Sequence, residues 1–376
     1  MSMELEVRKQ LLANCRRVVV KAGTRLLTDM ESLARIVEQI DTIRKSGKQV
    51  ILVSSGAVGI GMKLMGLKKR PSNLSEVQAL AALGQVKLMS AYQEECGKRN
   101  FLAAQVLLTA DDLRSRERHV NTLNCIEALL AKDILPVVNE NDPVSVSGLK
   151  FGDNDILASL LACMTRSDLT IILTTVDGLM KPNDDGTFGD RISVVKGITD
   201  TQRAMAKGTD NANLSLGGMA SKLKAADTLN SAGESLWLAS GKSPDILGKI
   251  FAGEDVGTVF LPAKAGKKLE SKKRWLASFS RSSGTLIIDD GAVCALRQKG
   301  RSLLPSGVKE TAGSFKRGDV LEIRSLTGEI IGKGLSNFTS EECALLAGCQ
   351  SSRNHEILGY DADEDIIHRN NMHVFK

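Results

Sequence analysis

Short apolar runs alternate with longer segments of helical periodicity from Arg17 to about Leu261. The run Val18–Val20 predicts a buried strand, and the apolar positions that recur between Leu33 and Ile43 predict an amphipathic helix. Further strands are predicted over six segments: Val50–Val53, Ala104–Leu108, Ile134–Val138, Leu169–Leu173, Leu236–Ala239 and Thr258–Leu261. Strands that alternate with helices in this way predict an α/β fold, in which helices sandwich a mostly parallel sheet.

Cap signals mark where two of the predicted helices begin. Thr28, followed three residues later by Glu31, precedes the first helix, and Ser75 with Gln78 opens a long segment rich in Ala and Leu. A hydroxyl residue three positions before Glu or Gln is the pattern of a capping box. We therefore expect these two helices to begin at Thr28 and Ser75.

The pattern changes after a basic segment between residues 264 and 281, which contains seven Lys and Arg residues and one acid, Glu270. Beyond it, short β-rich runs at Thr285–Ile288, Val320–Ile323 and Glu329–Gly332 alternate with glycine turns. Such a pattern predicts a small, barrel-like β-rich domain. The predicted organisation is a first domain over residues 1–265, a basic linker over 266–278 and a second domain over 279–376.

Composition excludes several classes of protein. The 376 residues exceed what one hydrophobic core commonly contains, and 42% hydrophobic with 25% charged residues are ordinary values for a globular chain. No stretch approaches the ~20 apolar residues of a membrane span, and the N-terminus has no apolar signal segment. The seven cysteines form no CxxC pair, and the four histidines show no metal-ligand spacing. We expect a cytoplasmic protein with reduced core cysteines and no dedicated metal site.

Candidate ligand-binding residues follow the first two predicted strands. Lys21-Ala22-Gly23-Thr24 follows the first strand, and Ser54-Ser55-Gly56-Ala57 follows the second. Ligands of parallel sheets bind beyond the carboxyl ends of the strands, so Lys21 and Ser55 are candidates for contact with a small ligand. The alternatives are a solvated lysine in an ordinary turn and a serine that only caps a helix.

Two groups of acids and amides flank the short segment Pro143–Phe151. Asn139-Glu140-Asn141-Asp142 precedes it, and Gly152-Asp153-Asn154-Asp155 follows it. Such side chains can bind an amino group or fix a lysine in place. The alternative is that both groups are polar turns at the ends of secondary structure.

The segment Gly217–Lys222 precedes an Ala-rich helix. Glycines at a helix start expose N–H groups, and the helix dipole favours phosphate there, whereas the alternative is a flexible glycine-rich loop. Together, two lysines, this helix start and several carboxylates, without a nucleophilic Cys or Ser–His pair, favour phosphoryl transfer.

These segments together resemble the amino acid kinase superfamily and, within it, the glutamate 5-kinase family, over roughly residues 16 to 372. In the tail, Trp275 and the segments Asp290–Ala292, Ser302–Val308 and Phe315–Asp319 resemble the PUA domain found on many bacterial members. The resemblance implies an amino acid kinase catalytic domain followed by a PUA-like barrel. It implies ATP-dependent phosphorylation of the side-chain carboxylate of L-glutamate to L-glutamyl 5-phosphate, the first step of proline biosynthesis, with Mg²⁺ bridging the ATP phosphates.

The resemblance also implies roles for individual residues. Catalysis would fall to Lys21, Lys222 and Asp155, and glutamate binding to Ser55, Asp142, Asn154 and Asp153. ATP would be bound by these residues: Lys21, Thr174, Thr175, Leu216, Gly217, Gly218, Met219, Ala220, Ser221 and Lys222. The family further implies a homo-oligomer, feedback inhibition by L-proline, and a glutamyl phosphate reductase as pathway partner.

The chain departs from the family pattern at Leu216, Thr175 and Arg25. These departures affect the contacts that the family makes with the nucleotide. One alternative is another kinase of the same fold, acting on acetylglutamate or aspartate, although a free α-amino group on the substrate favours an acid such as Asp142. The other alternative is RNA binding through the second domain. Residues 279–376 carry a net charge of −1 from 12 basic and 13 acidic side chains, which disfavours RNA binding.

Overall fold

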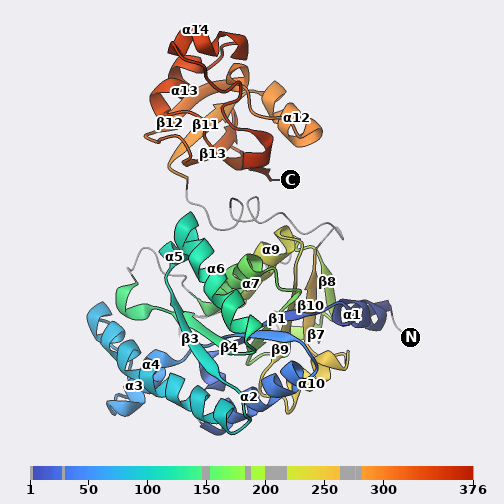
Figure 1. Ribbon diagram of the computed structural model, residues 1–376. Coiled ribbons are helices and arrows are strands. Elements are labelled where there is room, and N and C mark those ends of the chain that lie inside the picture. Colours follow the sequence, from blue (N-terminus) through green and yellow to red (C-terminus); the bar gives the residue numbers. More distant parts are fainter. Residues whose placement is uncertain are drawn as a thin grey trace. The chain divides into compact units, whose positions relative to one another are not determined.

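The computed structural model describes residues 3–27, 30–145, 153–182, 188–199, 218–262, 276 and 282–375. The chain divides into two compact units, Met1–Lys268 and Leu269–Lys376 (Figure 1). Of the basic linker expected at 266–278, only Leu276 lies within the described residues, so the predicted domain borders stay a prediction.

The first unit is built on an eight-stranded sheet, whose strands lie in the order β3-β4-β2-β1-β5-β9-β10-β8. Its members are β1 (Arg17–Ala22), β2 (Gln49–Val53), β3 (Ala103–Leu108), β4 (Leu135–Glu140), β5 (Leu169–Thr174), β8 (Val194–Lys196), β9 (Ser235–Ser240) and β10 (Thr258–Leu261). The strands from β3 to β9 pair in parallel, and β10 runs antiparallel to β9. The prediction of an α/β fold with a mostly parallel sheet is confirmed.

Every strand predicted from an apolar run in this unit is present, with ends that differ by one or two residues. The sequence did not predict the short strand β8 or the antiparallel hairpin of β6 (Met180–Pro182) and β7 (Phe188–Arg191). β8 has only three residues, and the short strands β6 and β7 mix charged residues with apolar ones, so none of them shows as an apolar run.

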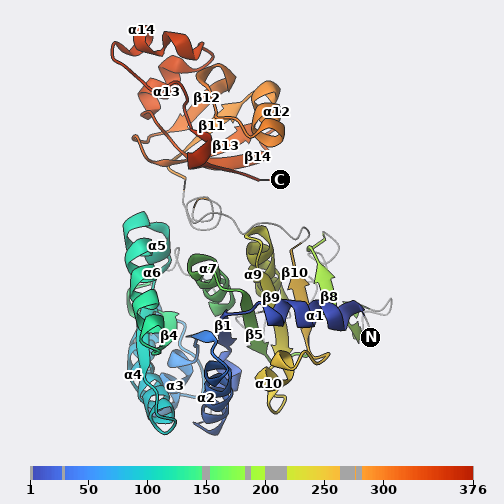
Figure 2. The ribbon, with the colours of Figure 1, turned by 45° about the vertical axis from the view of Figure 1, so that its right-hand side comes forward.

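Helices cover both faces of this sheet (Figures 1 and 2). They are α1 (Met3–Ala13), α2 (Met30–Lys45), α3 (Ala57–Leu64), α4 (Leu74–Gly97), α5 (Ala110–Arg114), α6 (Arg116–Ala131), α7 (Asn154–Thr165), α9 (Met219–Ser231) and α10 (Ile246–Phe251). One core joins α2, α4 and α10 to the side chains of Val18 and Val20 on β1. The helices α6, α7 and α9 lie on the opposite face (Figure 2).

The predicted amphipathic helix is α2, and its apolar residues from Leu33 to Ile43 are buried. The predicted cap residue Thr28 lies outside the described residues. The predicted start of α4 at Ser75 is wrong, because Asn73 is the cap and its side-chain oxygen accepts the backbone N–H of Ser75 at 2.9 Å. An Asn immediately before the helix can accept an N–H group of the first turn. Ser75 already lies inside that turn, so it donates this N–H group instead of capping the helix.

The second unit contains a five-stranded mixed sheet in the order β12-β11-β13-β14-β15. Its strands are β11 (Gly284–Ile288), β12 (Val308–Gly313), β13 (Val320–Ser325), β14 (Ile330–Leu335) and β15 (Met372–Val374), and its helices are α12 (Asp290–Lys299), α13 (Ser340–Leu346) and α14 (Asn354–Leu358). The unit has its own apolar core, which includes Leu286, Ile323 and Phe338. The prediction of a β-rich second domain is confirmed.

All seven cysteines lie in the described part of the chain and none forms a disulfide, but the expectation that they lie in the core holds for only four. Cys125 is exposed on α6, Cys294 is half-buried on α12 (Asp290–Lys299), and Cys349 is half-buried in the bend that follows α13 (Ser340–Leu346). In the described part of the chain, no helix is both long and apolar enough to span a membrane.

Candidate active site

Two lysines and one aspartate form a buried cluster at the carboxyl end of the sheet. Lys21 lies near the end of β1, between Val53 of β2 and Ile172 of β5. Its Nζ is 2.7 Å from Oδ1 of Asp155, and Nζ of Lys222 is 3.0 Å from the other carboxylate oxygen of Asp155. Asp155 is fully buried, and the two lysines are 7% and 5% exposed. One carboxylate of α7 thus joins a lysine of β1 to a lysine of α9.

The two aspartates of this cluster have opposite pKa shifts. Burial alone would raise the pKa of Asp155, but the charges of Lys21 and Lys222 outweigh burial and lower it below its usual value. The pKa of Asp153 is raised, first by burial and then by the negative charge of Asp155. Asp155 is therefore ionised at neutral pH, and Asp153 is the carboxylate that protonates first as the pH falls.

Ser221 connects the starts of two helices. Asp153 caps α7, with Oδ1 accepting the backbone N–H of Asp155 at 3.1 Å. Its other oxygen accepts a hydrogen bond from Oγ of Ser221 at 2.6 Å, in the first turn of α9. The N-termini of α7 and α9 are thereby tied together beside Lys21, whose Nζ is 3.8 Å from Asp153.

The N-terminus of α9 is the candidate phosphate site. Gly218 is its N-cap, and Met219 and Ala220 are half-buried at its start, whereas Leu216 and Gly217 lie outside the described residues. The first turn of a helix leaves N–H groups without partners inside the helix and favours anions. A lysine in this turn is unfavourable for the helix, and the Asp155 carboxylate offsets its charge.

Beside the charged cluster lies a cluster of uncharged groups. The side-chain Nδ2 of Asn154 donates to the backbone oxygen of Ser54 at 2.6 Å, to Oγ of Ser55 at 2.7 Å and to Oδ1 of Asn139 at 3.0 Å. Asn139 is buried and its Nδ2 donates to Oε1 of Gln85 on α4 at 2.8 Å. We call the side chains of Ser55, Asn139, Asn154 and Gln85 the amide cluster.

The sequence pointed to Ser55 and Asn154 but not to Gln85. The structure brings Ser55 and Asn154 into contact although 99 residues separate them. It places Asp142 two residues after the end of β4, in a 3-10 turn, η2 (Asp142–Val144), with a half-buried side chain. Gln85 carries no local signal, because it lies inside a long helix and its partner Asn139 is 54 residues away.

The two threonines predicted to line a nucleotide site lie at the end of β5. Thr174 is the last residue of β5 and Thr175 follows it, and both are half-buried. The backbone oxygen of Thr174 accepts the N–H of Gly241 at 2.8 Å, which fixes the end of β5 against the end of β9. Since β5 is the parallel neighbour of β1, these residues lie at the same carboxyl end of the sheet as Lys21.

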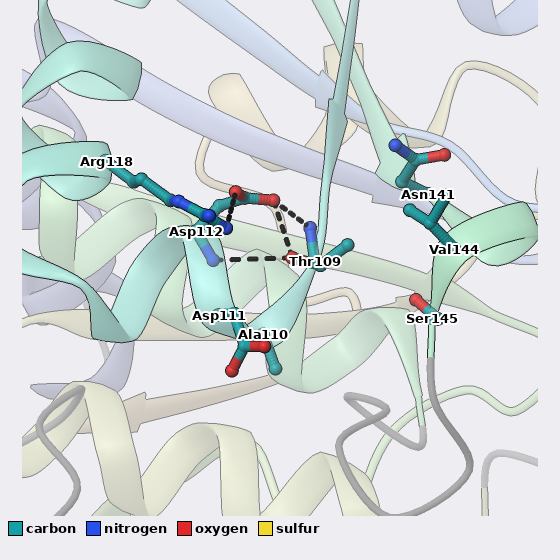
Figure 3. A pocket seen from close by; sticks show the side chains of 8 residues that line it. All are labelled: Thr109, Ala110, Asp111, Asp112, Arg118, Asn141, Val144 and Ser145. Carbon is teal, nitrogen blue, oxygen red and sulfur yellow. Dashed lines mark hydrogen bonds and ion pairs between the residues drawn. The ribbon is translucent and has the colours of Figure 1, made fainter.

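A pocket of about 290 Å³ opens beyond the ends of β3 and β4 (Figure 3). It is lined by Thr109, Ala110, Asp111, Asp112, Arg118, Asn141, Val144 and Ser145. Asp112 accepts hydrogen bonds from the backbone N–H and the hydroxyl of Thr109 and lies 3.4 Å from Arg118. Among the sequence candidates that the structure describes, only the group containing Asn141 reaches this pocket. The capping box of Thr109 and Asp112 was the local signal that could have drawn attention to it.

Paired lysines fixed by a carboxylate, at the ligand-binding edge of a parallel sheet and beside a helix N-terminus, define a phosphotransferase-type site. The model of the amino acid kinase family matches residues 16–240, and that of the PUA domain matches residues 284–358. The chain belongs to the amino acid kinase family and, within it, to the glutamate 5-kinases.

Relatives match this chain over almost its whole length. A protein named glutamate 5-kinase from Trichlorobacter lovleyi is 40% identical, over 97% of this chain and 98% of its own. One of the same name from Rhodopirellula baltica is 41% identical, over 98% and 96%. A solved structure of Giardia carbamate kinase covers 66% of this chain and 99% of its own, with 17% identity and a TM-score of 0.48.

Proposed function

We propose that this chain transfers the γ-phosphoryl group of ATP to the side-chain carboxylate of L-glutamate, forming L-glutamyl 5-phosphate in the first step of proline biosynthesis. The observation that carries the proposal is the pairing of Lys21 and Lys222 with the single carboxylate of Asp155. Family membership supports the use of ATP, and relatives named glutamate 5-kinase support glutamate as the acceptor.

The chemistry needs no base. A glutamate side chain has a pKa near ~4.3, so its carboxylate is ionised at neutral pH and is already the nucleophile. A carboxylate oxygen forms a bond to the γ-phosphorus, the bond from that phosphorus to the bridging oxygen breaks, and its electron pair stays on ADP. The obstacle is repulsion between the carboxylate and the triphosphate. Lys21, Lys222 and the N-terminus of α9 supply the positive potential that offsets it.

The amide cluster supplies the substrate contacts in this proposal. The two N–H hydrogens of Asn154 are directed at protein oxygens, so its remaining polar atom, Oδ1, is an acceptor. An acceptor suits the α-ammonium group of an amino acid. We assign Ser55 and Asp142 to the same substrate, since a carboxylate such as Asp142 also favours a free amino group.

Mg²⁺ that arrives with ATP would supply further neutralisation of the charge on the phosphates. The donor set fits a metal that arrives with the nucleotide. Both oxygens of Asp155 face lysines, and Asp153 already accepts hydrogen bonds from Ser221 and a backbone N–H. Among the described residues, no group of three or more acids, cysteines or histidines is arranged to bind a metal.

The test is ATP turnover in the presence of Mg²⁺ with hydroxylamine to trap an acyl phosphate. L-glutamate, N-acetyl-L-glutamate and L-aspartate are compared at equal concentration, with ATP omitted as the blank. We expect hydroxamate with L-glutamate and only background with the other two acceptors. Hydroxamate formed mainly from another acceptor would reassign the substrate, and none from any acceptor would contradict acyl phosphate formation.

We also propose that L-proline inhibits this reaction in competition with glutamate, because proline resembles a cyclised glutamate and suits the same Ser55 and Asn154 contacts. Initial rates measured with increasing L-proline should fall, and saturating L-glutamate should restore them. Unchanged rates at millimolar L-proline would contradict this. A homo-oligomer and a reductase partner stay predictions from the family.

A further inference from the structure

The orientation of the Asn139 amide is determined by its neighbours. Its Oδ1 accepts the backbone N–H of Glu140 at 2.9 Å, and a backbone N–H can only donate. The same oxygen faces Nδ2 of Asn154 at 3.0 Å. The amide nitrogen of Asn139 must therefore point the other way, where Oε1 of Gln85 lies at 2.8 Å.

The orientation of Asn154 follows in turn. Its Nδ2 lies 2.6 Å from the backbone oxygen of Ser54, which can only accept, so this atom is the nitrogen. The second N–H is directed at the oxygens of Ser55 and Asn139. A row of amides, from Gln85 through Asn139 to Asn154, thus leaves Oδ1 of Asn154 as the atom available to a ligand.

The helix that carries Gln85 is seated closely on the loop that carries Ser55. A Cβ added at Gly84 of α4 would lie 1.8 Å from the backbone oxygen of Ala57, and one added at Gly61 would lie 2.0 Å from that of Leu80. The helices α3 and α4 therefore meet backbone to backbone, and only glycine fits at these two positions. Gln85 follows Gly84 directly, so its place relative to the Ser55 loop is fixed.

We infer that Gln85 is a positioning residue for glutamate: by accepting the hydrogen bond of the Asn139 amide nitrogen, at the end opposite to the Glu140 N–H, it holds the Asn139 side chain against Asn154, whose Oδ1 then faces the substrate ammonium. This inference rests on the proposed function. Gln85 acts through Asn139 and contacts neither the lysines nor the nucleotide in this account. Its loss should therefore affect the use of glutamate and spare the use of ATP.

The experiment compares Gln85→Leu, which removes the acceptor, with Gln85→Glu, which keeps an oxygen acceptor in the same place. Lys87→Ala, an exposed position on the same helix, is the matched control. We expect Gln85→Leu to raise the KM for L-glutamate about tenfold, the effect of leaving a buried amide without its partner, with kcat and the KM for ATP almost unchanged. Gln85→Glu should recover most of the loss, and Lys87→Ala should match the unmodified chain.

Unchanged kinetics in Gln85→Leu, or an equal loss in Gln85→Glu, would overturn the inference. So would a joint change in kcat and both KM values, which indicates general damage to the fold. Thermal unfolding of each variant is measured in parallel. If Gln85→Leu does not fold, Gln85→Met tests the same loss of acceptor with an unbranched side chain. A parent chain that makes no hydroxamate from L-glutamate contradicts the proposed function, whereas an active parent with an unaffected Gln85→Leu contradicts only this inference.

Discussion

The charged cluster and the amide cluster lie side by side at the carboxyl end of the sheet. One is made of ionised side chains and the other of uncharged polar side chains. Lys21, Lys222 and Asp155 are buried formal charges, tied by ion pairs of 2.7 and 3.0 Å. The amide cluster has no charge and is ordered by hydrogen bonds of fixed direction, as between Asn139 and Gln85. Positive charge stabilises the transferring phosphoryl group, whereas hydrogen-bond acceptors and donors in fixed orientations select the substrate. The comparison implies that changes in the first cluster lower kcat and changes in the second raise KM.

The largest effect is expected from removing a lysine of the charged cluster. Lys21→Ala or Lys222→Ala should lower turnover by roughly 10²–10³-fold, because each removes a charge directed at the transferring group. Lys224→Ala, an exposed lysine of the same helix α9, is the matched control and should keep normal turnover. Circular dichroism checks that the variants fold. Normal turnover in a folded Lys222→Ala chain would remove that residue from the proposed role.

A large loss of stability is expected from Asp155→Asn, since it removes the carboxylate that lies within 3.0 Å of both buried lysines. The free energy of unfolding at neutral pH should fall by about 3 kcal/mol, the usual consequence of breaking a buried pair. The exposed Asp190→Asn is the control and should change it by less than about 0.5 kcal/mol. Urea unfolding measures both. Equal stability of the two variants would show that Asp155 does not offset the lysine charges.

The stabilisation that Asp155 provides should depend on pH in a definite direction. The pKa of Asp155 is lower in the folded chain than in the unfolded chain. Its carboxylate therefore stabilises the fold above its ordinary pKa, and this contribution is lost as the pH falls through the lowered value. The difference in unfolding free energy between the parent chain and Asp155→Asn should shrink as the pH drops below about 4. A difference that does not change with pH would contradict this.

The smallest effect on chemistry is expected from deleting the second unit. Both clusters consist only of residues from the first unit, so a chain that ends at Arg274 should keep turnover within about threefold of the full chain. Hydroxamate formation by the two chains, at matched concentration, measures this. A folded truncated chain without activity would show that the second unit contributes to the site.

A structural feature could be predicted from the sequence when the residues that form it lie close together along the chain. The apolar run Val18–Val20 and the helical spacing of α2 are local signals, and both elements were predicted. Lys21 and Ser55 were candidates because they follow strands, which is also local information. The bridging of two lysines by Asp155 is not local, since 67 residues separate Asp155 from Lys222. The resemblance to a family, not the pattern, linked these three residues.

The remaining errors have similar causes. The cap of α4 was placed at Ser75 because the capping-box pattern has several matches near a helix start, and only the geometry shows that Asn73 accepts the N–H bond. Gln85 was missed because a half-buried glutamine inside a helix has no pattern that marks it. Its role depends on the close contact of α3 and α4 at Gly61 and Gly84, which no periodicity reports.

The division of work between the two clusters is tested most directly by initial rates for Lys222→Ala and Asn154→Ala over a range of L-glutamate at saturating ATP. We predict that Asn154→Ala raises the KM for glutamate about tenfold or more and changes kcat little, whereas Lys222→Ala lowers kcat and leaves that KM within about threefold. The reverse pattern, with kcat lost in Asn154→Ala and KM raised in Lys222→Ala, would contradict the account.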